Sequence, residues 1–168
     1  METELHLPWD NDALQALLQK IIQTGETTKV DFKRQLNITT GEHHAELLKD
    51  ISALANAYDY SYRNHGFIIL GVSDSKLTHT RFDQNADGLQ ARIDELLKNY
   101  IEPFIPTQVR IFGSGEETWG VIVIPPTRTA PHVFVKEICK RCRGEIFVRR
   151  GTTTDKANRV DCSTDTQH

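Results

Sequence analysis

The chain has 168 residues and a mass of 19.1 kDa, with 38% hydrophobic residues, 26% charged residues and a formal net charge of −3. This length suits one domain, and the composition excludes disordered, collagen-like and membrane-spanning chains, since no apolar run approaches the roughly 20 residues that cross a bilayer. The start, Met1 to Glu4, lacks the basic and apolar regions of a secretory signal, and three cysteines cannot close a disulfide framework. We therefore expect a cytoplasmic protein with reduced thiols.

The first half of the chain alternates between helical and extended patterns. Leu14, Leu18 and Ile22 recur at helical spacing after the capping candidate Asp10, which predicts a helix within residues 1–24. Apolar and charged residues then alternate over 29–36, which predicts a strand with one charged face. A second helix is predicted over 42–58, and the apolar run at 66–72 is typical of a strand buried on both faces.

The second half contains one helix and then a series of short strands. The apolar spacing predicts a third helix over 89–100, which Pro103 ends. Strands are predicted at 108–112, 118–125, 133–135 and 145–150, with hairpin turns at 113–117 and 139–144. This order indicates an α+β fold, a single domain whose mixed β-sheet is accompanied by about three helices. We expect the domain to span 25–154 and residues 155–168 to form a flexible polar tail.

Charge is distributed unevenly along the chain. Residues 136–159 contain eight basic and three acidic residues, a net charge of +5 in a chain whose total is −3. Such a local surplus can attract a polyanion even when the whole chain is acidic, although a merely solvated face has the same pattern. The basic residues that we expect to hold a phosphate backbone are Lys136, Lys140, Arg141, Arg143, Arg149 and Arg150.

Acidic residues gather around the first two predicted strands. Asp31 and Lys33 fall on the same face of the first strand, Glu26 lies in the turn before it, and Asp74 follows the buried strand. If the two strands are neighbours, three carboxylates could converge and bind Mg²⁺ or Mn²⁺ through oxygen, with Lys33 holding a phosphate. The alternative is a surface strand with a local Asp31–Lys33 ion pair and an unrelated acid at Asp74.

Four segments, taken together, resemble the Schlafen-type AlbA-like domain family. They read GETTKVDFK at 25–33, LKDISALAN at 48–56, GFIILGVSD at 66–74 and FVRRGTTT at 147–154. Any one of these pieces is common, but their order and spacing over nearly the whole chain are fairly specific. The resemblance implies a Schlafen AlbA-like fold that binds nucleic acid, RNA or DNA, through a basic groove.

The resemblance implies two functions. Vertebrate Schlafens are metal-dependent endoribonucleases that act on transfer RNA and other structured RNA, and their acidic triad corresponds here to Glu26, Asp31 and Asp74. In that reading a divalent ion held by the acids orients the attacking oxygen, and Lys33 stabilises charge on the phosphate. Many bacterial members are instead described as DNA-binding regulators that often precede an ATPase-like region, which is missing here, and this implies a non-catalytic DNA- or RNA-binding module. Such a chain would act through this module alone or with a separate ATPase partner, and the resemblance also allows a homodimer.

Two positions depart from the family pattern. The second acid is usually Glu, and Asp31 is one methylene shorter, which would move a bound metal by about 1 Å. The usual Gly-Gly turn after Asn56 is replaced by a longer loop, residues 57–65, which is rich in aromatic and polar side chains. The tyrosines of this loop, Tyr58, Tyr60 and Tyr62, are able to stack on unpaired bases; the alternative is that the loop packs on its own domain.

Cys139 and Cys142 have the spacing of a zinc knuckle, with His132 and Cys162 as further candidate ligands. Zinc requires four ligands, and the sequence contains no second paired motif. The sequence therefore favours a plain hairpin turn with two reduced thiols over a zinc site.

Overall fold

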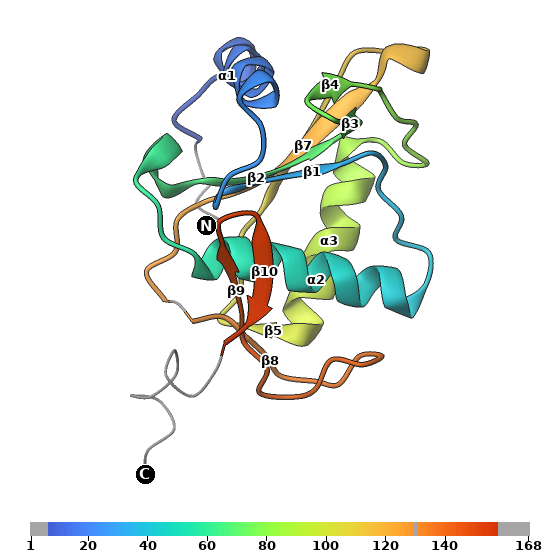
Figure 1. Ribbon diagram of the computed structural model, residues 1–168. Helices are drawn as coiled ribbons and strands as arrows, with labels where there is room; N and C mark the ends of the chain where they lie inside the picture. Colours follow the sequence, from blue (N-terminus) through green and yellow to red (C-terminus); the bar gives the residue numbers. More distant parts are fainter. Residues whose placement is uncertain (1–6, 130, 158–168) are drawn as a thin grey trace, which may run out of the picture.

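The computed structural model describes residues 7–129 and 131–157 and centres on a mixed four-stranded sheet (Figure 1). The strand order is β1 (Val30–Lys33), β2 (Gly66–Leu70), β7 (Trp119–Ile124) and β6 (Gln108–Phe112). β1 and β2 run parallel, whereas β7 is antiparallel to both of its neighbours. The predicted α+β class with a mixed sheet is confirmed.

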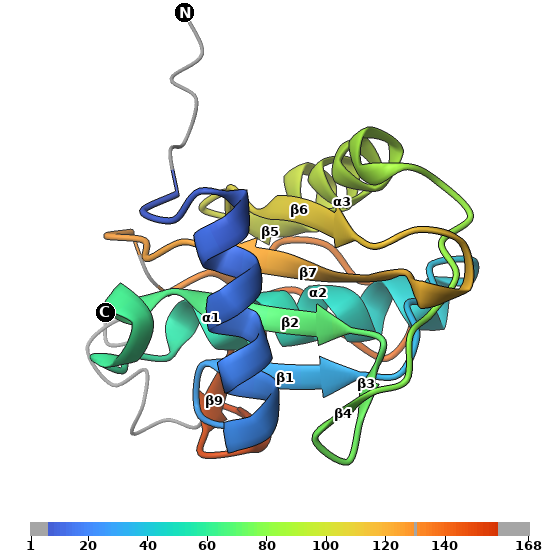
Figure 2. The same ribbon diagram turned by 90° about the horizontal axis from the view of Figure 1, so that it is seen from above.

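Both faces of the sheet are covered by helices. α1 (Asn11–Thr24) lies across one face, and α2 (Gly41–Asn56) and α3 (Ala86–Tyr100) lie on the other, as Figure 2 shows. The central strands β2 and β7 are buried along their whole length, so their uninterrupted apolar sequences fit this sandwiched position. Two apolar clusters result, one under α1 and a larger one under α2 and α3.

The three predicted helices are confirmed, and a side chain caps each N-terminus. Asp10 accepts a hydrogen bond from the Ala13 amide at 2.8 Å, which confirms the predicted cap of α1. Thr40 and Asn85 cap α2 and α3 in the same way. Among the described residues, no helix is long and apolar enough to cross a membrane.

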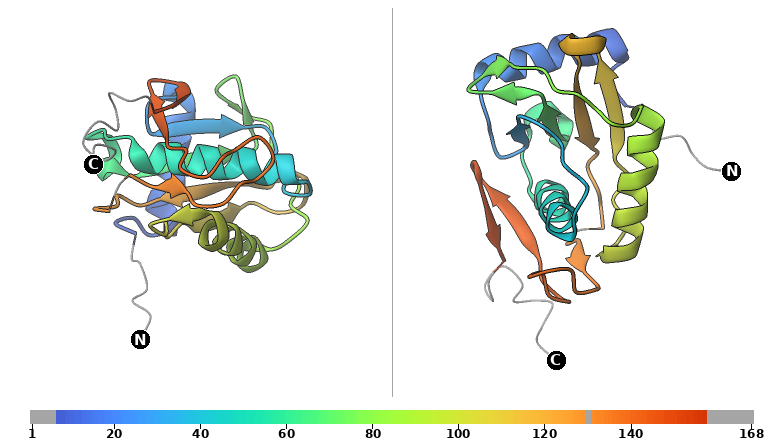
Figure 3. Two further views of the ribbon diagram at one scale, coloured as in Figure 1. Left: turned by 90° about the horizontal axis from the view of Figure 1, so that it is seen from below. Right: turned by 90° about the vertical axis from the view of Figure 1, so that its right-hand side faces the viewer.

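Three two-stranded ribbons and two 3₁₀ turns complete the fold. β3 (Val72–Ser73) pairs with β4 (Lys76–Leu77), β5 (Ile101–Glu102) with β8 (Val133–Phe134), and β9 (Phe147–Arg150) with β10 (Thr153–Lys156); the turns are η1 (Ser61–Asn64) and η2 (Gly115–Glu117). The β9–β10 hairpin lies beside α2, apart from the main sheet (Figure 3, right). β10 runs beyond residue 154, so the predicted boundary there falls inside a strand, and residues 158–168 of the predicted tail lie outside the described residues.

Candidate functional site

Asp31 and Lys33 face α2 from the edge strand β1. The Lys33 Nζ lies 3.3 Å from the Asp31 carboxylate, so the side-by-side placement expected from strand alternation is observed. A third residue joins them, because Asp50 of α2 lies 2.7 Å from the same Nζ. The sequence offers no signal for this contact, since Asp50 is an ordinary charged residue beside the apolar stripe of its helix.

Arg149 of β9 completes this group from the opposite side. Its guanidinium is 3.5 Å from Asp31 and donates to the backbone oxygens of Val30 at 2.8 Å and Thr27 at 3.3 Å. Only 6% of the residue is exposed. Unlike the other cations predicted to bind phosphate, Arg149 is therefore buried with its donors in use, and it fastens β9 to the start of β1.

These four residues, Asp31, Lys33, Asp50 and Arg149, are called the charge cluster below. Burial alone would lower the pKa of Lys33, but the carboxylates of Asp50 and Asp31 outweigh it and raise that pKa above its ordinary value. Burial raises the pKa of Asp50, which Lys33 partly opposes. Two acids thus face two bases, and Lys33, whose side chain is 28% exposed, is held between two carboxylates.

The two other predicted acids, Glu26 and Asp74, lie in a separate cleft at the free edge of β1. This edge cleft has a volume of about 430 Å³ and is lined by Glu26, Phe32, Arg34, Val72, Ser73, Asp74, Ser75 and Thr152. Glu26 accepts a hydrogen bond from the Phe32 amide at 2.8 Å, which covers part of the unpaired strand edge. Asp74 sits at the β3–β4 turn with a positive φ of 51°.

The structure thus brings Glu26 and Asp74 into one cleft and places Asp31 in the charge cluster. Across residues 7–129 and 131–157, no three His, Cys, Asp or Glu side chains are grouped so that they could hold a metal ion. A Mg²⁺ or Mn²⁺ ion needs several oxygen ligands that are free to bind it. In this arrangement the three acids do not fit a shared metal site, because both oxygens of Asp31 face cations.

The loop between β8 and β9 carries most of the predicted phosphate ligands, and residues 136–144 are called the basic loop below. Ile138 and Arg141 exchange backbone hydrogen bonds of 3.0 and 2.8 Å around a tight turn. Arg141 contacts Glu46 of α2 at 3.2 Å and lies 5.1 Å from the centre of the Phe147 ring. Arg141 therefore anchors the loop against α2.

The remaining cations of this region differ in their availability. Lys136, Lys140 and Arg143 are exposed, and no ion-pair partner for them is found in the described part of the chain. Arg150 lies 3.9 Å from Asp155, and Lys156 lies 3.6 Å from Glu145. The basic loop thus presents three exposed cations that form no ion pair within the described residues, beside one exposed acid, Glu137.

The two cysteines of the basic loop are exposed. The hydrogen bond to Glu145 raises the pKa of the Cys142 thiol, which favours the protonated form that metals do not bind. The candidate ligand His132 is buried, and its ring nitrogens contact the Pro103 oxygen and the Thr127 hydroxyl, each at 2.6 Å. Both ring nitrogens of His132 are thus engaged within the domain; Cys162 lies outside the described residues.

Two polar residues near the end of α2, the buried Lys29 and the partly buried Asn56, have no signal in the sequence. Lys29 donates to the backbone oxygens of Leu54 at 2.6 Å and Ala57 at 2.9 Å, and burial lowers its pKa to about 8. The Asn56 side chain donates to His132 and Phe147 and accepts from the His132 amide. Both residues satisfy backbone groups that burial separates from water.

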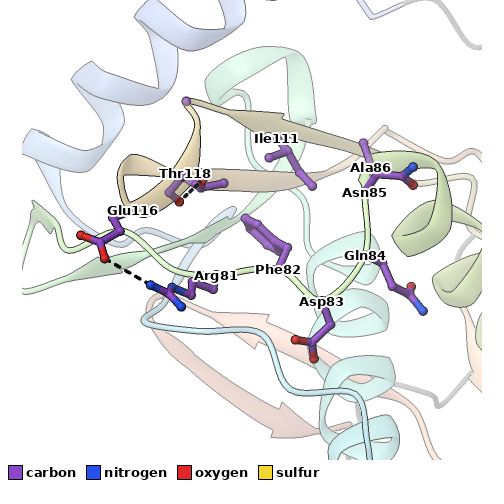
Figure 4. A pocket seen from close by; sticks show the side chains of 11 residues that line it. Arg81, Phe82, Asp83, Gln84, Asn85, Ala86, Ile111, Glu116 and Thr118 are labelled. Carbon is purple, nitrogen blue, oxygen red and sulfur yellow. Dashed lines mark hydrogen bonds and ion pairs between the residues drawn. The ribbon is translucent and has the colours of Figure 1, made fainter.

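A larger cavity of about 740 Å³ lies between the segment before α3 and the end of the β6–β7 hairpin (Figure 4). Phe82 and Ile111 form its apolar part, whereas Arg81 is engaged 3.2 Å from Glu116 at its rim. The cavity contains no grouped acids or uncompensated cations, so it supports no phosphate chemistry by itself.

The chain matches a known protein family. A family model described as Schlafen, AlbA_2 matches residues 26–158, a span that includes the charge cluster, the edge cleft and the basic loop. No curated protein matches the chain.

Proposed function

Because this chain belongs to the Schlafen, AlbA_2 family, and this membership suggests nucleic-acid binding, we propose that it binds the phosphate backbone of RNA or DNA through its basic loop. The proposal rests on one observation. Lys136, Lys140 and Arg143 stand exposed on a loop that Arg141 fastens to α2. Cations that form no ion pair with a carboxylate need not break one before they bind phosphate. Their binding also releases counterions from the nucleic acid.

Structured RNA such as transfer RNA is the ligand we place first. A folded RNA offers closely spaced phosphates in a fixed arrangement, which suits a fixed set of cations. Duplex DNA is the alternative ligand, since phosphate contacts by themselves carry no sequence information. A homodimer would double the number of cations on one ligand, and sedimentation analysis of the purified chain tests that part of the proposal.

Binding is tested by the double variant Lys140→Gln/Arg143→Gln. We expect weaker binding to labelled transfer RNA and a plot of log K against log salt whose slope is lower by about 2, one unit for each lost phosphate contact. The matched control is Lys20→Gln/Lys98→Gln, which removes two exposed cations from α1 and α3. An unchanged slope in the first variant would remove the basic loop from the interface.

Metal-dependent cleavage of RNA is a second candidate function. Glu26, Asp74 and the cation Arg34 share the edge cleft, which supports it, whereas the pairing of Asp31 with Lys33 and Arg149 argues for binding without cleavage. The test incubates the chain and an Asp74→Ala variant with transfer RNA in Mg²⁺, Mn²⁺ or EDTA. Cleavage that needs metal and is lost in the variant would support the nuclease; binding without cleavage would support the regulatory module.

A further inference from the structure

Two tyrosines of the loop after α2 are displayed to solvent. Tyr58 is 67% exposed and Tyr60 is 86% exposed, and among the described residues the only other large exposed hydrophobic side chain is Phe104, at 38%. The Tyr58 and Tyr60 rings lie 5.2 Å apart in an edge-on arrangement. Aromatic rings usually bury most of their surface, so a pair left in water indicates a surface that meets a partner.

The rest of the loop holds these rings in place. Tyr62 packs on Phe67 with 5.7 Å between ring centres, and His65 packs on Trp9 at 5.0 Å. Tyr62 is the first of three consecutive residues with positive φ, at 53°, 54° and 59°, a conformation that persists only where surrounding contacts impose it. The loop is therefore divided, with Tyr62 and His65 packing inward and Tyr58 and Tyr60 facing outward.

Internal hydrogen bonds reinforce this shape. Asp59 accepts from the Ser61 amide at 2.8 Å, and the Asn64 side chain accepts from the Asp59 amide at 3.0 Å. A loop fixed in this way loses little conformational entropy when a ligand binds to it.

We propose that Tyr58 and Tyr60 form a stacking platform for unpaired nucleobases, so that the protein favours nucleic acid with a single-stranded segment. This inference rests on the proposed nucleic-acid binding and specifies which part of the ligand this end of the molecule contacts. Every base has a π-face, so stacking on tyrosine needs no particular sequence. Exposed Arg63 in the same loop supplies a positive charge for the adjoining phosphate.

The neighbours of the two rings favour a nucleobase over a protein surface. Asp59, Ser61 and Arg63 alternate with the aromatic residues, so the rings are not part of a continuous apolar area. Stable protein interfaces bury a broad patch with an apolar centre, whereas stacked bases need isolated ring faces with polar groups between them.

The basic loop contacts the N-terminal half of α2, whereas the two tyrosines follow the C-terminal end of that helix. Arg141 contacts Glu46 in the N-terminal half of the helix, and Tyr58 follows its C-terminal end. Ten residues separate Glu46 from Asn56, the last residue of α2, a length of about 15 Å at helical rise. This separation is within the reach of one strand, because single-strand sites commonly hold about 4–16 nucleotides.

The test compares a labelled single strand of about 12 nucleotides with its duplex, since that length fills one such site. For Tyr58→Ala/Tyr60→Ala we expect at least about tenfold weaker binding to the single strand and unchanged binding to the duplex. Tyr58→Phe/Tyr60→Phe should keep single-strand binding, because phenylalanine also stacks. Phe104→Ala is the control for loss of another exposed aromatic ring.

The outcomes separate this inference from the proposed function. Suppose that the alanine variant binds the single strand normally while Lys140→Gln/Arg143→Gln loses affinity for it. The stacking platform is then contradicted, and phosphate binding by the basic loop is supported. If the wild-type chain binds neither probe, both proposals fall. If the alanine substitutions only convert a dimer into a monomer, the two tyrosines form an interface between copies, and the platform is overturned.

Discussion

The guanidinium of Arg149 lies 3.5 Å from the carboxylate of Asp31 and joins the β9–β10 hairpin to the edge of the main sheet. The same guanidinium donates to the backbone oxygens of Thr27 and Val30. One contact therefore has two consequences. It holds the hairpin that follows the basic loop, and it occupies the acid that a metal site would need.

We predict that Arg149→Met destabilises the fold by about 3–5 kcal/mol, because the substitution leaves the partly buried Asp31 carboxylate and two carbonyl groups without this partner. Urea unfolding followed by circular dichroism measures the change. Arg150→Met, at the more exposed neighbouring position, should cost less than about 1 kcal/mol. Equal losses in the two variants would contradict a special role for the Arg149 contacts.

Lys29 should make stability rise with pH in the alkaline range. Its pKa is lowered from 10.5 to about 8 in the folded protein, so between these values the unfolded chain binds more protons than the folded one. The free energy of unfolding contributed by Lys29 therefore increases as pH rises through this window, by up to about 3 kcal/mol.

The measurement for Lys29 is a series of urea unfolding curves for the wild-type chain and Lys29→Met across that pH window. We expect the difference in unfolding free energy between the two proteins to change with pH. The control Lys20→Met removes an exposed lysine from α1 and should give a constant difference. A constant difference for Lys29→Met as well would contradict the lowered pKa.

His132 should make the fold sensitive to mild acid. The Pro103 oxygen can only accept, so Nδ1 of His132 donates to it, and Nε2 shares a hydrogen bond with the Thr127 hydroxyl, which can donate or accept. Burial lowers the pKa of His132 below its ordinary 6.5. The unfolded chain then binds more protons near that pH, so stability falls as pH drops below about 6.5.

Unfolding free energies measured from about pH 7 to about pH 5 test this prediction, since this is the range where histidine titrates. We expect His132→Gln to be less stable than wild type at neutral pH but to show a shallower decline with acid. Burial also lowers the pKa of His65, so part of the decline should remain in the variant. A decline as steep as that of wild type would contradict the role of His132.

Asn56 should be important for stability although it is a polar residue at a helix end. Its side chain forms hydrogen bonds of 3.0 and 2.8 Å to the His132 and Phe147 oxygens and one of 2.7 Å from the His132 amide. We predict that Asn56→Ala costs about 2–4 kcal/mol, because buried backbone groups on two segments lose their partners. Thermal unfolding compared with Asn99→Ala, an exposed position of α3, provides the check.

Local periodicity in the sequence was enough to predict the three helices, the central strands and the shared face of Asp31 and Lys33. These features depend on repeats of 3.6 and 2 residues that the backbone imposes on any chain. The four family segments likewise predicted the family that residues 26–158 match. Roles for individual charges did not follow from this information, because periodicity says only which side of its own element a residue faces.

Tertiary structure alone decided which charges meet. Docking of β9 beside α2 and the edge of β1 buries Arg149 against Asp31, while Lys140 and Arg143 stay exposed on the preceding loop. Asp31 does not line the edge cleft that Glu26 and Asp74 share. A charge changes from a surface ligand to a buried structural contact when another element displaces its water, and that depends on segments far apart in the chain.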